Sequence, residues 1–338
     1  MSGRARWSWW TLALGVGLGL GATLWLVRHV ALDETLERLA RFDAGRLGLL
    51  AGLAALNLGA RTARWRHCFE RSARPGSRAA FEALALGTAA NSFLPARGGD
   101  LLRAALITRA SRAVSLGLAV ASLALEKLLD GIALVALAVG AATQLEPPGW
   151  FTKLVALAAA GFATALVVFL WIGRGRSPRS HPAAAGVTSR LRRAWIDFAR
   201  GLAALRGPRR LASLSLATAI VWLTDLASVW IIGRGLGVEL GLLGAACLTA
   251  VVGLGLMLPA APAALGSYEL LCVAALSLVG VAPEPGLAVG LALHAWTLAV
   301  TAAAAVIALA VAGLARLREA RRAPSSAAPG RSGELPLP

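Results

Sequence analysis

The sequence predicts an all-α polytopic membrane protein with about six full transmembrane helices and two re-entrant helical hairpins. Of its 338 residues, 57% are hydrophobic and only 15% are charged, whereas soluble domains carry about 25% charged residues. Uninterrupted apolar runs of about 20 residues recur, which is the length of a membrane-spanning helix. Arginines gather between these runs, as the positive-inside rule describes. These observations exclude a soluble domain and a disordered chain, and the lack of alternating polar and apolar residues disfavours a barrel.

The charge balance is strongly basic, with 34 Lys+Arg against 17 Asp+Glu and a formal net charge of +17. In a soluble protein this excess would suggest a nucleic-acid partner. Here the arginines lie between apolar runs, so membrane topology explains them and no nucleic-acid partner is expected. Three cysteines form no CxxC pair and four histidines show no metal-ligand spacing, so we expect no metal and no cofactor.

The apolar runs mark six full spans, with an amphipathic surface helix expected after the first. The spans are 7–27, 47–60 with its flanks, 114–142, 151–172, 211–232 and 287–313, and the surface helix is 33–46. We assign residues 1–315 to one integral membrane domain and residues 316–338 to a disordered basic tail.

Two basic loops, 61–78 and 173–210, set the predicted orientation. Both are rich in arginine and are therefore placed in the cytoplasm, which puts both chain termini there as well. The second half of the longer loop lines up Leu191, Trp195 and Phe198 on one helical face. This pattern is typical of an interfacial helix next to anionic lipid headgroups.

Two apolar segments, 79–110 and 242–282, are each interrupted by proline and glycine. In the first, Ala79 to Leu94 covers 16 residues, or about 24 Å of helix, short of a hydrocarbon core of about 30 Å. Both segments therefore predict re-entrant hairpins, which are tolerated where protein or a water-filled cavity surrounds them. The break residues are Asn91, Pro95, Gly98 and Gly99 in the first hairpin and Pro259, Pro262 and Gly266 in the second.

The two hairpins indicate an inverted repeat. Gly99 precedes Glu126 by 27 residues, and Gly266 precedes His294 by 28. Each distance joins a break to a polar group inside the next span, and arginine placement makes the first hairpin enter from the cytoplasm and the second from outside. Interrupted helices at matching positions of inverted repeats mark the binding site in transporters.

Glu126, Lys127 and Asp130 lie near the middle of a span, where each charge costs about 2.5–3.5 kcal/mol on insertion scales. Glu126 and Asp130 share a helical face because they are four residues apart. Two interpretations remain open at this point. The charges form a structural ion pair that holds the bundle together, or they line a polar pathway with Arg97 and Arg103 as partners.

Arg97, Asp100 and Arg103 cluster at the first break. Guanidinium groups bind phosphate through two parallel hydrogen bonds, and the free amides of a broken helix add partial positive charge. We therefore expect Arg97 to anchor a phosphate and Glu126 to be its counter-charge when the site is empty. The alternative is that these arginines only reach toward the cytoplasmic interface.

Tyr268, Glu269 and His294 are the counterparts in the second repeat. A single histidine in a span is more often a hydrogen-bonded packing residue than a ligand. Asp225, in the fifth of the listed spans, is expected to pair with Lys127 or an arginine. No nucleophile with a base and no phosphate-binding loop is evident, so the sequence predicts no enzyme activity.

Two segments resemble the lysylphosphatidylglycerol synthase transmembrane-region family, whose members are also called flippase-like. Asn91-Ser-Phe-Leu-Pro95-Ala-Arg97-Gly-Gly99-Asp100-Leu-Leu-Arg103, followed by Glu126-Lys127-Leu-Leu-Asp130, is similar to the family's Asn, Leu-Pro, Gly, Arg run and Glu-Arg-x-x-Asp helix. Lys127 stands where arginine is usual. Pro259 to Glu269 resembles the family's second break, with Ala264-Leu265-Gly266 in place of its Gly-Gly.

The resemblance, which covers about residues 10 to 315, implies a lipid-handling membrane domain in the bacterial inner membrane. Members fused to an aminoacyl-transferase domain make lysyl-phosphatidylglycerol and move it between leaflets. No segment of these 338 residues resembles that domain, so the synthase activity is not expected here. The expected partners are membrane phospholipids, anionic ones above all.

Three functions follow from these observations. The leading one is translocation or binding of a phosphate-bearing lipid. The second is a membrane scaffold that recruits or regulates a cell-envelope enzyme through its basic loops. The third, a membrane glycosyltransferase with Asp100 as base, would need a nucleotide or metal cluster that the sequence does not contain.

Overall fold

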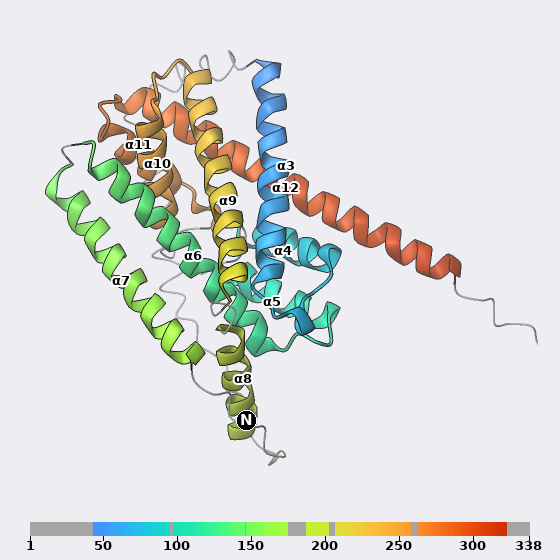
Figure 1. The fold of residues 1–338 in the computed structure, drawn as a ribbon. Helices are drawn as coiled ribbons and strands as arrows, with labels where there is room; N and C mark the ends of the chain where they lie inside the picture. Colours follow the sequence, from blue (N-terminus) through green and yellow to red (C-terminus); the bar gives the residue numbers. More distant parts are fainter. Residues whose placement is uncertain are drawn as a thin grey trace, which may run out of the picture.

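The computed structural model describes residues 43–92, 94, 97–145, 147–174, 187–202, 207–257 and 262–322. The first expected span, most of the surface helix, and Pro95 and Pro259 lie outside these residues. The described residues form helices and connecting turns, without a strand, in agreement with the all-α prediction (Figure 1). The helices are α3 (Ala44–His67), α4 (Ser77–Asn91), α5 (Gly98–Ala110), α6 (Leu116–Ala142), α7 (Gly149–Arg174), α8 (Val187–Leu202), α9 (Pro208–Gly235), α10 (Leu242–Gly255), α11 (Ser267–Ser277) and α12 (Pro283–Arg322), with 3₁₀ turns at Arg71–Ala73 and Pro262–Ala264.

Three of the described helices are long and apolar enough to cross a membrane: α7, α9 and α12 as far as Ala315. Helices α3 and α6 have 24 and 27 residues, or about 36 Å and 40 Å at the α-helical rise. Helix α6 carries charges near its middle, and α3 carries most of its charges in its second half, from Arg61 onward. Helix α12 continues to Arg322, into the segment that the sequence analysis assigned to a disordered tail.

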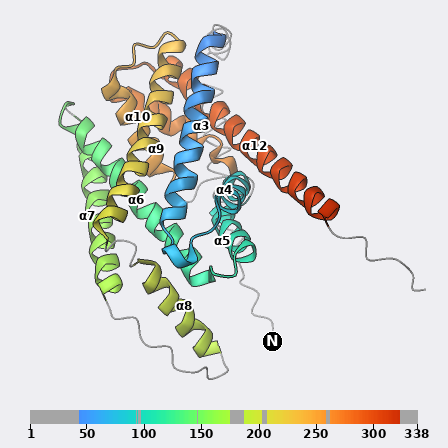
Figure 2. The same cartoon turned by 45° about the vertical axis from the view of Figure 1, so that its right-hand side comes forward.

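Both predicted hairpins consist of two short helices around a break. Helices α4 and α5 form the first, and α10 and α11 form the second. The two pairs lie toward opposite ends of the bundle in both views (Figures 1 and 2). The chain reverses through left-handed backbone in each break, at Arg97 (φ 57°) in the first and at Ala263, Ala264 and Gly266 (φ 53°, 56° and 74°) in the second.

Close backbone contact joins the two arms of the first hairpin. A Cβ atom on Gly99 would lie 2.0 Å from the carbonyl oxygen of Gly87 and 2.6 Å from the amide of Asn91. Any side chain at Gly99 would therefore push α4 and α5 apart, which explains why this break residue is glycine.

The helix contacts follow a reciprocal pattern. Within each half, the first arm packs on the second arm and the second arm packs on the following long helix, α6 or α12. Between the halves, α4 packs against α12 while α10 packs against α6, and α3 packs along α9. Exchanging α3, α4, α5 and α6 for α9, α10, α11 and α12 thus reproduces these contacts. The two main clusters of buried apolar residues lie mostly on α3–α6 in one case and mostly on α9–α12, with part of α6, in the other.

Helix α8 confirms that the 173–210 segment contains a helix, and it packs across α6. A Cβ atom on Gly117 would lie 2.4 Å from the carbonyl oxygen of Ala194, so the two backbones nearly touch. Leu202 is buried, whereas Leu191 and Trp195 are more than half exposed. The apolar face of α8 is therefore shared between the bundle and its surroundings.

Candidate functional site

Helix α3 continues past the predicted end of the second span. The sequence analysis placed Arg61 and Arg64 in a cytoplasmic loop, but the helix runs to His67 and Arg64 is fully buried, with 0% of its surface exposed. The prediction was wrong because it treated the first arginine after an apolar run as the end of the span. A charge can remain inside a bundle when carboxylates from another helix pair with it.

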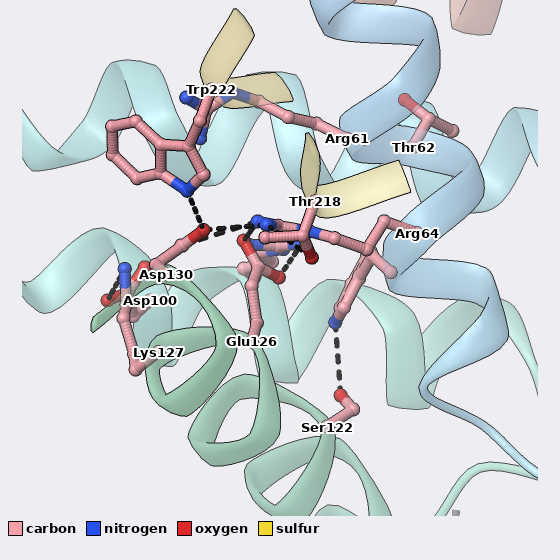
Figure 3. Close-up of polar contacts among 12 residues, drawn as sticks. Arg61, Thr62, Arg64, Asp100, Ser122, Glu126, Lys127, Asp130, Thr218 and Trp222 are labelled. Atoms are coloured by element: carbon pink, nitrogen blue, oxygen red, sulfur yellow. Dashed lines mark hydrogen bonds and ion pairs between the residues drawn. The ribbon is translucent and has the colours of Figure 1, made fainter. Parts of the chain in front are cut away.

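The buried partner of Arg64 is Asp130 on α6. The Arg64 Nη1 atom donates to Asp130 Oδ1 at 2.6 Å, and Nη2 donates to Oδ2 at 3.3 Å. Nη2 also lies 3.5 Å from Glu126 Oε1. Figure 3 shows Glu126 and Asp130 side by side on α6, both turned toward Arg64.

Arg103 of the first hairpin is the main partner of Glu126. Its Nη1 and Nη2 atoms donate to Glu126 Oε1 at 3.1 Å and Oε2 at 2.7 Å. This fork-to-fork geometry is the strongest arrangement of an arginine and a carboxylate. Arg103 was predicted as a partner for the α6 acids, which is confirmed, but Glu126 was also predicted as the counter-charge of Arg97, which is wrong because Arg103 and Arg64 already engage both of its oxygens.

We call Arg64, Arg103, Glu126 and Asp130 the buried ion-pair cluster. Each is at most 6% exposed, and the two positive charges balance the two negative ones. Two tryptophans complete it. Trp65 lies under the Arg103 guanidinium at 3.8 Å and donates to Ser122, and Trp222 donates to Asp130 Oδ1 at 3.2 Å.

A second group of charges lies beside this cluster and is partly exposed. Lys127 Nζ lies 3.6 Å from Asp100 Oδ2, with the two side chains 38% and 22% exposed. Asn91 donates to the other Asp100 oxygen at 3.3 Å. Arg97, also partly exposed, precedes α5 and makes no hydrogen bond or ion pair with the described residues. We call Arg97, Asp100 and Lys127 the accessible charge cluster, and it carries one more positive than negative charge.

The second hairpin holds a polar pair formed by two of the residues that the sequence analysis named as counterparts of the first. His294 Nδ1 lies 2.5 Å from Glu269 Oε1, and Nε2 lies 2.8 Å from the carbonyl oxygen of Ala263 in the break. The ring of Tyr268 stacks on His294 with centroids 4.5 Å apart. Glu269 and His294 are both 5% exposed. The structure therefore brings these three predicted residues together but keeps them separate from the two clusters of the first hairpin.

Helices α3 and α9 are joined by a third polar group. Arg61 Nη2 donates to Asp225 Oδ2 at 2.8 Å, and Asn57 Nδ2 donates to Asp225 Oδ1 at 2.9 Å. Asp225 thus pairs with an arginine, one of its two predicted partners. Sequence reasoning missed the role of Asn57, Arg61 and Arg64, although their spacing of four and three residues along one helical face was a signal.

Residues 12–323 match the lysylphosphatidylglycerol synthase TM region. The chain belongs to this family. Family membership and the long apolar helices make it an integral, multi-pass membrane protein of a lipid-associated family. No curated protein and no solved structure matches the chain.

The chemistry that these side chains offer is binding of charge. Among the described residues, no three His, Cys, Asp or Glu side chains gather closely enough to hold a metal ion. The buried ion-pair cluster is internally neutralised, whereas the accessible charge cluster keeps a surplus cation next to the start of α5, where the side chain of the N-cap residue Arg97 does not cap the helix. The accessible cluster is therefore the part of the site that suits an anion.

Proposed function

We propose that this protein binds a phosphate-bearing lipid at the first hairpin and moves it between the leaflets of the bacterial inner membrane. The observation that carries the proposal is the guanidinium of Arg97, which has no partner among the described residues and lies at the start of α5 in a cluster with one surplus positive charge. A lipid phosphate would neutralise that surplus. Its oxygens would accept two parallel hydrogen bonds from Arg97 and further ones from the first amides of α5.

Lys127 and Asp100 supply a second element of the proposed site. Their contact of 3.6 Å is long for an ion pair, and both side chains are partly exposed. An arriving phosphate would compete with Asp100 for the Lys127 ammonium, so the cluster exchanges one anion for another and does not bury a new charge. Anionic phospholipids are the proposed partners, because zwitterionic headgroups bring a cation that the cluster would repel.

The helix arrangement supports movement as well as binding. Reciprocal contacts between α3–α6 and α9–α12 are those expected of an inverted repeat whose hairpins enter from opposite faces. In transporters of this architecture, one repeat rocks against the other around a site at the broken helices. The first hairpin would then be the lipid site and the second its structural counterpart.

Translocation in liposomes tests the proposal. Purified full-length protein is reconstituted with trace fluorescent phosphatidylglycerol, and the fraction of label bleached by an impermeant reductant is followed over time. We expect faster equilibration of the label across the bilayer than in protein-free vesicles, and no such acceleration for a labelled lipid without a phosphate. Equal rates with and without protein would favour the second function, a scaffold for a cell-envelope enzyme.

A further inference from the structure

The second hairpin contains a buried acid–base pair that lipid binding at the first hairpin does not use. The Oε1 atom of Glu269 on α11 lies 2.5 Å from Nδ1 of His294 on α12. Gly290 has no side chain, and this allows the two helices to approach each other closely. A Cβ atom at Gly290 would lie 3.0 Å from Cys272 Cβ and 3.5 Å from Glu269 Cα. The chain thus brings α11 close to α12 one helical turn before His294.

The hydrogen bonds of His294 determine how many protons the pair holds. Nε2 faces the carbonyl oxygen of Ala263 at 2.8 Å, and a carbonyl only accepts, so Nε2 carries a proton. Nδ1 faces a Glu269 oxygen at hydrogen-bond distance, so a second proton lies between these two atoms. The pair is then neutral, either as imidazolium with carboxylate or as imidazole with carboxylic acid.

Loss of the shared proton breaks one of the two contacts. If Nε2 keeps its proton, lone pairs face each other between Nδ1 and Glu269, and a buried carboxylate is left unpaired at high cost. If the remaining proton moves to Nδ1, Glu269 stays paired, but the Nε2 lone pair then faces the carbonyl oxygen of Ala263. The second arrangement avoids the unpaired charge, so deprotonation detaches the break from α12.

No ion pair from another element reaches this pair within the part of the chain that the structure describes. Among the described residues, no lysine or arginine contacts Glu269 or His294, and Glu269 Oε2 is buried without a hydrogen-bond partner. The other titratable or charged groups on these helices and on those packed against them are Tyr268 and Cys272 on α11, Cys247 on α10, Asp225, Arg209, Arg210 and Arg234 on α9, Arg78 and Glu82 on α4, and, on α12 itself, Glu284 together with Arg316, Arg318, Glu319, Arg321 and Arg322 at its far end. Of these, Asp225 pairs with Arg61, and Arg78 pairs with Glu82.

We propose that Glu269 and His294 form a proton-binding site that holds the break of the second hairpin against α12 and releases it when the shared proton leaves. Ala263 and Ala264 occupy left-handed backbone, at φ 53° and 56°, which is strained for residues with a Cβ atom. The His294 contact helps to keep that conformation, so its loss frees the break to rearrange. The proton site stands on its own geometry, and a coupling of proton binding to lipid movement rests on the proposed function.

Cysteine labelling in the break tests the proton site. Leu265 is 54% exposed and lies in the break, and Leu242 is 65% exposed at the start of α10. The full chain, as Leu265→Cys or Leu242→Cys, is placed in phosphatidylglycerol nanodiscs and labelled with a maleimide between about pH 5 and pH 9. The labelling rate of Leu265→Cys is divided by that of Leu242→Cys, and this ratio removes the pH dependence of the thiol reaction itself.

We expect this ratio to rise with pH by about tenfold, the effect of losing one strong hydrogen bond on an opening equilibrium. Glu269→Gln should keep the ratio low at every pH, because the Gln amide donates to Nδ1 and has no proton to lose. His294→Ala should keep it high at every pH. If His294→Ala does not fold, the wild-type and Glu269→Gln profiles decide the matter.

If the ratio of labelling rates stays constant with pH while Glu269 and His294 are unchanged, the proposed proton site is wrong. A ratio that follows sodium concentration at fixed pH would also overturn it, since the site would then take a metal cation. Neither result bears on the proposed function, because labelling requires no lipid movement. Conversely, absence of translocation by the wild-type protein would contradict the proposed function. The labelling profile would still decide whether Glu269 and His294 form a proton site.

Discussion

Arg103 and Glu126 hold each other through two parallel hydrogen bonds, of 3.1 Å and 2.7 Å, between the first hairpin and α6. Because Arg103 is stacked on Trp65 as well, its guanidinium has little freedom to meet a lipid. A phosphate at this position would have to displace Glu126 from a fully desolvated pair. The pair therefore fixes the hairpin on α6, and Arg97, six residues earlier and unpaired among the described residues, is the proposed anion ligand.

The Arg103–Glu126 contact predicts strong coupling between these two residues. Removing one partner leaves a buried charge and should cost about 3–5 kcal/mol of stability. We expect Arg103→Met with Glu126→Gln to cost clearly less than the sum of the two single changes, as measured by thermal unfolding in detergent. Arg97→Ala with Glu126→Gln should instead give additive losses, since these two residues share no contact. Additive losses for Arg103→Met with Glu126→Gln, together with coupling between Arg97→Ala and Glu126→Gln, would mean that Glu126 is the counter-charge of Arg97.

The buried ion pair of Arg64 predicts a second effect on stability. The sequence alone does not suggest this effect, because Arg64 follows an apolar run as loop arginines do. Among the described residues, Arg64→Ala would leave only Trp222 as a hydrogen-bond partner of Asp130, so it should lower the melting temperature strongly. Arg64→Lys should recover only part of the loss, because one ammonium cannot bridge Asp130 and Glu126 in the same way. Arg71→Ala is the matched control, since Arg71 is exposed, and it should unfold like the wild type. Equal melting temperatures for all four proteins would contradict the burial of Arg64.

Gly99 predicts a steric effect in the first hairpin. Gly99→Ala places a Cβ atom 2.0 Å from the Gly87 carbonyl oxygen, so α4 and α5 must separate and stability should fall. Gly161→Ala on α7 meets nothing within 4 Å and should be neutral or stabilising by up to about 1 kcal/mol through helix propensity. Expression and thermal stability of the two variants provide the comparison. A well-folded Gly99→Ala protein would show that the arms are not in contact.

The reciprocal helix contacts predict that the two hairpins start on opposite sides of the membrane. Ser77 begins α4 and Leu242 begins α10, and both are exposed. A cysteine at Ser77 should be protected from an impermeant reagent in intact cells, as should one at residue 180 in the longer basic loop, whereas a cysteine at Leu242 should be labelled. Labelling of both hairpin positions from the same side would exclude an inverted arrangement.

The sequence was sufficient for the all-α fold class and for the two pairs of short helices around the breaks, because apolar runs, prolines and glycines report directly on helices and their interruptions. It also predicted that Arg103 partners the α6 acids, and it named Tyr268, Glu269 and His294 as counterparts without predicting the contact between Glu269 and His294. It failed at Arg64, because positive charge after an apolar run is the usual mark of a cytoplasmic loop. Whether such an arginine leaves the membrane depends on carboxylates from a distant helix, here α6, and that is a tertiary contact no local pattern contains.

The distinct roles of Arg97 and Arg103 can be tested most directly by lipid translocation in liposomes with a matched pair of variants. Arg97 and Arg109 flank the same helix, and Arg109 is exposed in its last turn. We predict that Arg97→Ala abolishes the accelerated movement of fluorescent phosphatidylglycerol while the protein inserts and unfolds normally, that Arg97→Lys restores part of it, and that Arg109→Ala moves lipid at the wild-type rate. Wild-type translocation by Arg97→Ala would contradict the assignment of Arg97 as the phosphate anchor.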